Sequence, residues 1–254
     1  ENPLIKADLP KRYIKTLHYI INAQIELLDL KNARSNIKLM RDLPDQPGFQ
    51  GRSTEAQVFV ASFVSELRLL DRAGEHVKAM ALSEPILKGM EEMGERLHKE
   101  HELEFNFALA RVHFGGNEQN KALFFLNKVL NDNEPTLRQD IFTYARLFNL
   151  VIHYELGNFD LLEYIVRSTQ RFLNKRHPAD VMETSLIEHI KKLARAKEPS
   201  QKRDLFKSMQ DQFKPLMKDP GESLVLKYFD VMAWVDSHVE GIPFSDVVRR
   251  SVKD

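Results

Sequence analysis

The sequence has no cysteine among its 254 residues. Disulfide bonds, thiolate metal sites and cysteine nucleophiles are therefore excluded. Glycine and proline are also few, with 10 and 11 residues, and most of them lie between apolar stretches. Inside a helix, Gly costs about 1 kcal/mol and Pro about 3 kcal/mol relative to Ala. Their scarcity therefore predicts a small number of long helices joined by turns.

Long apolar runs are absent as well. One of the most apolar stretches, Val58–Val60 with Phe63 and Val64 nearby, is far shorter than the ~20 residues that a membrane-spanning helix needs. No signal-peptide pattern opens the sequence, and we expect a cytoplasmic protein. The formal net charge is zero, which argues against a protein that binds nucleic acid over its whole surface.

The charge is nevertheless unevenly distributed. Residues 165–218 carry 13 Lys or Arg and 6 Asp or Glu, whereas residues 84–104 carry 3 and 7. Binding of nucleic acid or another polyanion through the basic region 165–218 is therefore the alternative function. The aromatic residues of this region, Phe172, Phe206 and Phe213, have the spacing of core residues. We do not expect them to stack on bases.

Apolar residues recur at helical spacing along nearly the whole chain. The first such stripe consists of Ile14, Leu17, Ile21, Ile25 and Leu28. No stretch shows the two-residue alternation of a half-buried strand over strand length. The sequence therefore predicts an all-α fold.

The turns recur at a nearly constant distance. Breaks inside helix pairs are expected near Asn32, Gly74, Gly116, Gly157, Glu198 and Gly241, with gaps of 42, 42, 41, 41 and 43 residues. Breaks between pairs are expected near Pro44–Gly51, Gly94, Asn131–Pro135, His177–Pro178 and Asp219–Gly221. This spacing predicts six antiparallel helix pairs in an elongated right-handed superhelix. Pro85 falls inside the fourth helix, which must either kink or restart there.

One helix pair resembles a tetratricopeptide repeat (TPR). Its pattern is carried by Leu109–Ala110, His113–Phe114, the turn Gly115–Gly116 and Ala122. The consensus Trp of the family is absent, and the repeat has about 42 residues instead of about 34. The resemblance implies a single TPR-like α-α superhelical domain over residues 1–254. It also implies a non-catalytic scaffold that binds a protein or peptide in a concave groove.

In such a fold the first helix of each pair lines the groove. Transferred to this sequence, the groove residues are Asn22, Glu26, Val64, Arg68, Arg72, Phe107, Arg111, Leu147, Val151, Glu188, Lys192 and Arg195. The cations predict an acidic peptide or a chain terminus as the partner. Charge reversal of Arg68 and Arg111 is then expected to abolish binding and to leave thermal unfolding nearly unchanged. The alternative is that these cations pair with neighbours such as Asp71, Glu104 and Glu155.

The sequence has no phosphate-binding loop and no HExxH zinc motif. The turn Gly115–Gly116 is not followed by the residues of a phosphate-binding loop. His98 and His101 have the spacing of two ligands on one helix face, but they lie in a highly polar stretch that favours a solvated helix start. We therefore expect no enzyme activity, no metal and no cofactor.

The two ends of the chain differ in character. The last predicted helix, from Pro243 to Lys253, has one apolar face and one charged face, as the end of a helix stack requires. The first helix is apolar beyond a single stripe, at Ile20, Ile21, Leu27 and Leu30. We therefore expect further helices before residue 1 in the native protein.

Overall fold

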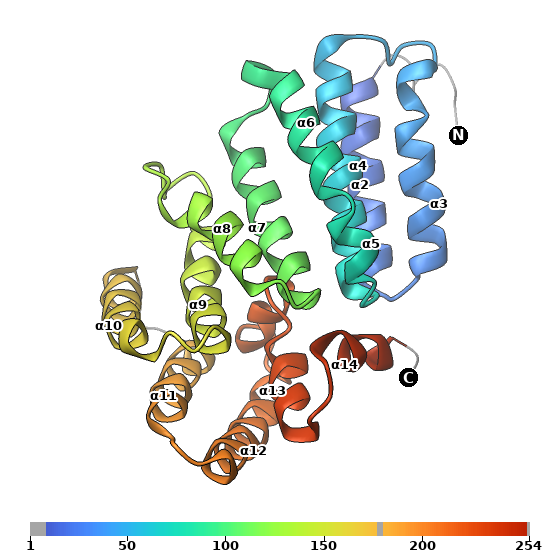
Figure 1. Cartoon of the computed structure of the whole chain (residues 1–254). Coiled ribbons are helices and arrows are strands. Elements are labelled where there is room, and N and C mark those ends of the chain that lie inside the picture. The colour runs from blue at the N-terminus through green and yellow to red at the C-terminus, as the bar shows by residue number, and fades with distance from the viewer. Residues whose placement is uncertain (1–8, 177–179, 253–254) are drawn as a thin grey trace.

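A computed structural model of the chain describes residues 9–176 and 180–252 (Figure 1). Within these ranges all regular elements are helices and no strand occurs, which confirms the all-α prediction. The α-helices are α2 (Pro10–Glu26), α3 (Leu30–Arg41), α4 (Arg52–Arg72), α5 (His76–Met80), α6 (Ser83–Met93), α7 (Lys99–Gly115), α8 (Gln119–Leu130), α9 (Gln139–Glu155), α10 (Phe159–Arg176), α11 (Val181–Arg195), α12 (Pro199–Leu216), α13 (Val231–Glu240) and α14 (Phe244–Ser251). Three short 3-10 helices are η1 (Leu43–Asp45), η2 (Gly94–Arg96) and η3 (Glu222–Lys227). None of the described helices is both long and apolar enough to cross a membrane.

Consecutive helices form pairs whose turns fall close to the predicted positions, at Gly74, Gly116, Gly157, Glu198 and Gly241. The prediction of a first turn near Asn32 is wrong. That turn lies at residues 27–29, and Asn32 belongs to α3, where its backbone N–H donates to the capping side chain of Asp29. The predicted break at His177–Pro178 lies outside the described residues.

The fourth predicted helix is divided. It ends as α5 at Met80 and starts again as α6 at Ser83, so Pro85 lies in the first turn of a new helix. A proline is tolerated there because the first N–H groups of a helix have no partner within it. The sequence left open whether the helix kinks or restarts at Pro85, and the structure shows that it restarts.

The first helices of the middle pairs form the core of the molecule. In α9 nearly every side chain from Ile141 to Tyr154 is buried, because this helix packs against α7 and α8 on one side and against α10 and α11 on the other. Helix α10, a second helix on the outside of the molecule (Figure 1), buries one face only. Each large apolar side chain buried in this way contributes about 1.5–3 kcal/mol to stability.

The C-terminal part of the chain curls back onto the second, third and fourth pairs (Figure 1). The Arg249 guanidinium donates from Nε to the carbonyl of Gly74 at 3.1 Å, and the ring of Phe244 meets that of Phe114 edge-on. In α13, the helix before α14, Trp234 donates its indole N–H to Glu155 at 2.7 Å. These aromatic and polar contacts join the last pair to the middle of the chain, and the structure does not confirm the predicted elongated right-handed superhelix.

Two glycines allow helices to approach closely. At Gly74, whose φ is +67°, an added Cβ would lie 2.6 Å from Cγ of Arg249. At Gly115, the last residue of α7, an added Cβ would lie 2.3 Å from the ring of His76. A side chain at either position would separate elements that now touch.

Replacing Gly115 with Ala is expected to destabilise the fold by about 1–3 kcal/mol, the usual cost of overpacking. Ala favours a helix over Gly by about 1 kcal/mol, so a loss of stability would identify the clash with His76 as its cause. Urea unfolding measures the change, with Gly221→Ala as an exposed control. A Gly115→Ala variant as stable as the wild type would contradict the close packing.

Candidate binding pocket between α2, α4 and α7

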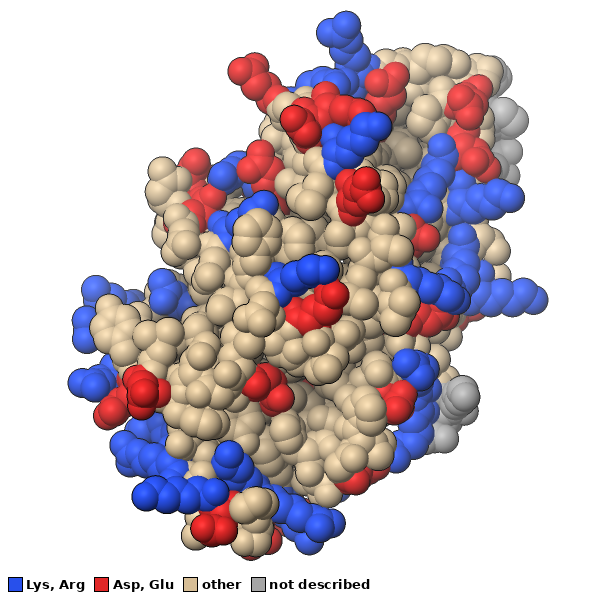
Figure 2. Space-filling model, viewed as in Figure 1, with Lys and Arg blue, Asp and Glu red and all other residues tan. Residues whose placement is uncertain are grey.

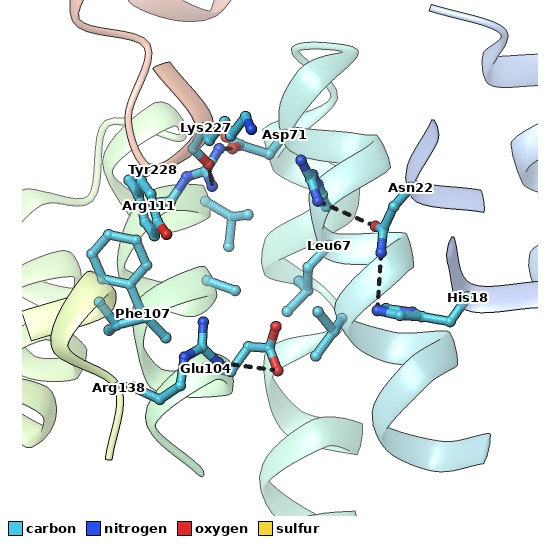
Figure 3. Close-up of a pocket in the computed structure, with 15 residues that line it drawn as sticks. His18, Asn22, Leu67, Asp71, Glu104, Phe107, Arg111, Arg138, Lys227 and Tyr228 are labelled. Carbon is cyan, nitrogen blue, oxygen red and sulfur yellow. Dashed lines mark hydrogen bonds and ion pairs between the residues drawn. The ribbon is translucent and has the colours of Figure 1, made fainter. Parts of the chain in front are cut away.

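A pocket of about 190 Å³ opens between the first helices α2, α4 and α7 (Figure 3). Of the groove residues predicted from the sequence, it contains Asn22, Val64, Arg68, Phe107 and Arg111. Side chains from α2 and α7 face each other across α4 in the close-up view. The structure thus brings together predicted residues from three successive pairs.

The remaining predicted residues do not line this pocket. Glu26 is half-exposed and pairs with Arg68, and Arg72 pairs with Asp230 at 3.5 Å next to a smaller adjoining cavity. Leu147 and Val151 are only 2% and 0% exposed. The prediction that these two residues line a groove is wrong, because α9 is surrounded by helices on all sides.

The predicted residues of the fifth pair lie elsewhere. Glu188 pairs with Lys191 on α11 at 3.0 Å. Lys192 and Arg195 are exposed on the same helix and do not line the pocket. Helix α11 packs against α9, and no residue of α11 lines the pocket.

Arg68 is held by polar groups of α2. Its guanidinium pairs with Glu26 and donates to the side-chain oxygen of Asn22 at 3.3 Å. The Asn22 amide lies 2.9 Å from Nε2 of His18, and Nδ1 of His18 lies 3.1 Å from the hydroxyl of Ser65. Burial lowers the pKa of His18, which therefore stays neutral at pH 7. These contacts fix Asn22 and leave Arg68 about one-third exposed.

Arg111 links three segments of the chain. It pairs with Asp71 at the end of α4, and it donates to the carbonyl of Lys227 in η3 at 3.1 Å. Asp71 also lies 3.1 Å from Nε2 of His76 in α5. Burial alone would raise the pKa of Asp71, but Arg111 and His76 together lower it to about 2. The expectation that Arg111 is dispensable for folding is therefore not supported by its contacts, because its removal would leave a buried carboxylate poorly paired.

Ten of the residues that line the pocket were not predicted as groove residues, and among them are His18, Glu104, Arg138 and Tyr228. Arg138 lies between α8 and α9, forms a two-pronged pair with Asp140 and approaches Glu104 at 3.8 Å. Tyr228 follows η3, and its hydroxyl donates to Asp140 at 2.9 Å. Arg138 and Tyr228 lie in segments between helices. Helical periodicity therefore could not predict that they reach the pocket.

The pocket is rich in ion pairs, formed by Arg68 with Glu26, by Arg111 with Asp71 and by Arg138 with Asp140. Ser65 is fully buried, so its hydroxyl beside His18 is out of reach of a substrate. Among the described residues, no group of three or more potential metal ligands occurs. Neither protein-family models, nor curated proteins, nor solved structures match this chain.

The contacts of Asp71 predict a specific dependence of stability on pH. A carboxyl whose pKa falls from 3.8 to about 2 on folding stabilises the folded state above pH 4, and this stabilisation is lost as the pH falls toward 2. Asp71→Asn should therefore lower the free energy of unfolding by about 2 kcal/mol at pH 7. The difference from wild type should shrink below pH 4 in urea titrations. A difference that is independent of pH would contradict the assignment.

Proposed function

We propose that this chain is a TPR-like α-solenoid that acts as a non-catalytic scaffold and binds an acidic segment of a protein partner on its concave face. The pocket between α2, α4 and α7 is the binding site in this proposal. A cytoplasmic location is part of the same proposal. The observation that supports it most is the ion pair of Arg68, because this cation lies in the pocket and its partner Glu26 is half-exposed.

Arg68 differs from the other arginines of the pocket in how firmly it is held. Arg111 is bound to a buried carboxylate and to a backbone carbonyl, and Arg138 is bound to Asp140 through two hydrogen bonds. Glu26, by contrast, has a side chain that is 51% exposed. Exposed ion pairs contribute only about 0–1 kcal/mol. A carboxylate of a partner can therefore replace Glu26 at little cost.

The surroundings of Arg68 favour a carboxylate that is followed by an apolar group. Val64, Leu67 and Ala108 are among the apolar residues that line the same pocket. The amide of Asn22 and the hydroxyl of Tyr228 already form hydrogen bonds within the chain. A ligand therefore does not need to supply a hydrogen-bond partner for either group. A charged hydrogen bond to Arg68 would contribute about 1.5–3 kcal/mol where water is excluded.

A library of displayed peptides, selected on the full chain, tests the proposal. We expect enrichment of peptides with Asp, Glu or a C-terminal carboxylate next to an apolar residue. Arg68→Glu should weaken binding of the selected peptides about ten-fold or more, equivalent to at least about 1.4 kcal/mol. Arg34→Glu is the matched control, because Arg34 forms a similar pair with Glu75 at 2.6 Å outside the pocket. Equal binding by both variants would overturn the proposal.

Polyanion binding by residues 165–218 remains the second candidate. Figure 2 shows Lys and Arg side chains gathered at the lower left of this face, over α10 to α12. The ion pairs between described residues in this region include Arg167–Glu163 and Lys191–Glu188, and none involves Arg171, Lys192 or Arg195. Phe206 and Phe213 are buried, as expected, and are not stacking platforms.

A salt titration separates the two candidates. If the basic region binds nucleic acid, affinity for a labelled single-stranded oligonucleotide should fall by more than ten-fold between about 50 mM and about 200 mM salt. Lys192→Glu combined with Arg195→Glu should weaken that binding, whereas Arg68→Glu should not change it. Absence of measurable binding at low salt would exclude the second candidate.

A further inference from the structure

A second and larger cavity lies where the C-terminal pair meets the middle of the chain. Its volume is about 840 Å³, and it is lined by the turns after α4 and α7, the C-terminal end of α9, and parts of α13 and α14 (Figure 1). We name it the junction cleft, and its lining includes Gly74, Gly116, Glu155, Trp234 and Phe244. None of its lining residues lines the pocket between α2, α4 and α7. Clefts between packed units are common ligand sites.

Glu155 contributes a carboxylate to the wall of the junction cleft. Its Oε1 lies 2.7 Å from the indole nitrogen of Trp234 and 2.7 Å from Nε2 of His238, and its side chain is 21% exposed. Among the described residues, no Arg or Lys pairs with Glu155, and no group donates to its Oε2. Asp71 and Asp140, by contrast, are each paired with an arginine. Oε2 of Glu155 is therefore available to a cation from outside the chain.

His76 supplies a second acceptor to the same cleft. Its side chain is 1% exposed, and its Nε2 lies 3.1 Å from the carboxylate of Asp71. The carboxylate favours the hydrogen on Nε2, which leaves the lone pair of the neutral ring on Nδ1. Nδ1 has no hydrogen-bond partner among the described residues. Since buried polar atoms nearly always have a partner, this atom favours a ligand that donates hydrogen bonds.

The other charged side chains of the junction cleft are already paired within the chain. Lys78 pairs with Glu75 at 2.8 Å. Arg249 donates to the carbonyl of Gly74 at 3.1 Å and pairs with Asp246 at 2.9 Å. The guanidinium of Arg249 thus already binds an acceptor in the wall of the cleft. Of the carboxylates in the lining, Glu155 is the one that has no Arg or Lys beside it among the described residues.

We propose that the junction cleft binds an organic cation, an alkylguanidinium or alkylammonium group on an apolar body, with Glu155 as its counter-ion. The cation donates to Oε2 of Glu155, and His76 supplies a further acceptor. The apolar body packs against Val77, Ile242 and Phe244, which line the cleft and are at least partly exposed. The aromatic face of Phe244 also favours a cation. The same chemistry is present in a free amine or guanidine and in an Arg or Lys side chain of a protein partner.

Isothermal titration calorimetry of the full chain with two matched pairs of probes tests the proposal. The first pair is butylguanidine and butylurea, and the second is a peptide with arginine between two leucines and the same peptide with citrulline. The members of each pair differ in charge and hardly in shape. We expect the cationic member to bind at least about ten-fold more tightly in the pair that carries the natural chemistry. A preference seen with butylguanidine indicates a free compound, and one seen with the peptide alone indicates a protein partner. No preference in either pair would contradict the proposal.

The variant Glu155→Gln tests the counter-ion. It keeps a side-chain oxygen that can accept from Trp234 or His238 but removes the charge, so binding of the cationic probe should weaken about ten-fold or more. Asp236→Asn is the matched control, because Asp236 also lies in α13 next to the cleft, accepts from Gln210 at 2.7 Å and does not line the cleft. Circular dichroism shows whether both variants are folded. Equal weakening by both, or by neither, would contradict the role of Glu155.

A measurement on the wild type locates the ligand even if Glu155→Gln fails to fold. The ¹⁵N resonances of the imidazole rings of His76 and His238 are expected to shift when the cationic probe that binds is added. The neutral member of the same pair should leave them unchanged at the same concentration. If both rings keep their resonances at saturation, the cation binds elsewhere and the proposal is wrong.

Discussion

The buried carboxylate of Asp71 is the contact on which the arrangement of the molecule depends most. It lies at the end of α4 and meets Arg111 of α7 and His76 of α5. Through Arg111 it also reaches the carbonyl of Lys227, far along the chain. A buried charge that loses its partner costs several kcal/mol, so these four segments are fixed relative to one another. The wall of the pocket that contains Arg111 is fixed by the same contact.

The pocket depends on segments that are remote in sequence. Two of its walls come from α4 and α7, but Tyr228 lines it only because η3 folds back onto α7, where Arg111 donates to the carbonyl of Lys227. The ring of Tyr228 stacks on Tyr144 at 4.1 Å, and the next residue, Phe229, packs against Phe114 and Phe148. One wall of the pocket therefore depends on the docking of the C-terminal segment.

Sequence periodicity located most of the helix pairs, because a glycine or a polar break interrupts the apolar pattern at Gly74, Gly116, Gly157 and Gly241. It also placed Arg68 and Arg111 on one face of adjacent helices, which share a pocket. It failed at Leu147 and Val151, since a helix that is buried all round has no inner face to assign. It could not foresee the return of α14, because the curvature of a helix stack accumulates from many small packing angles and leaves no local pattern.

The contact between Trp234 and Glu155 has a practical consequence. Trp234 is the single tryptophan of the sequence, its side chain is buried, and its indole N–H is bonded to a residue of the fourth pair. Its fluorescence therefore reports on one place only, the junction between the last pair and the middle of the chain. Helix content would hardly change if that junction opened, whereas the indole would pass from an apolar setting into water. The fluorescence of Trp234 would therefore report whether the last helix pair is docked on the middle of the chain.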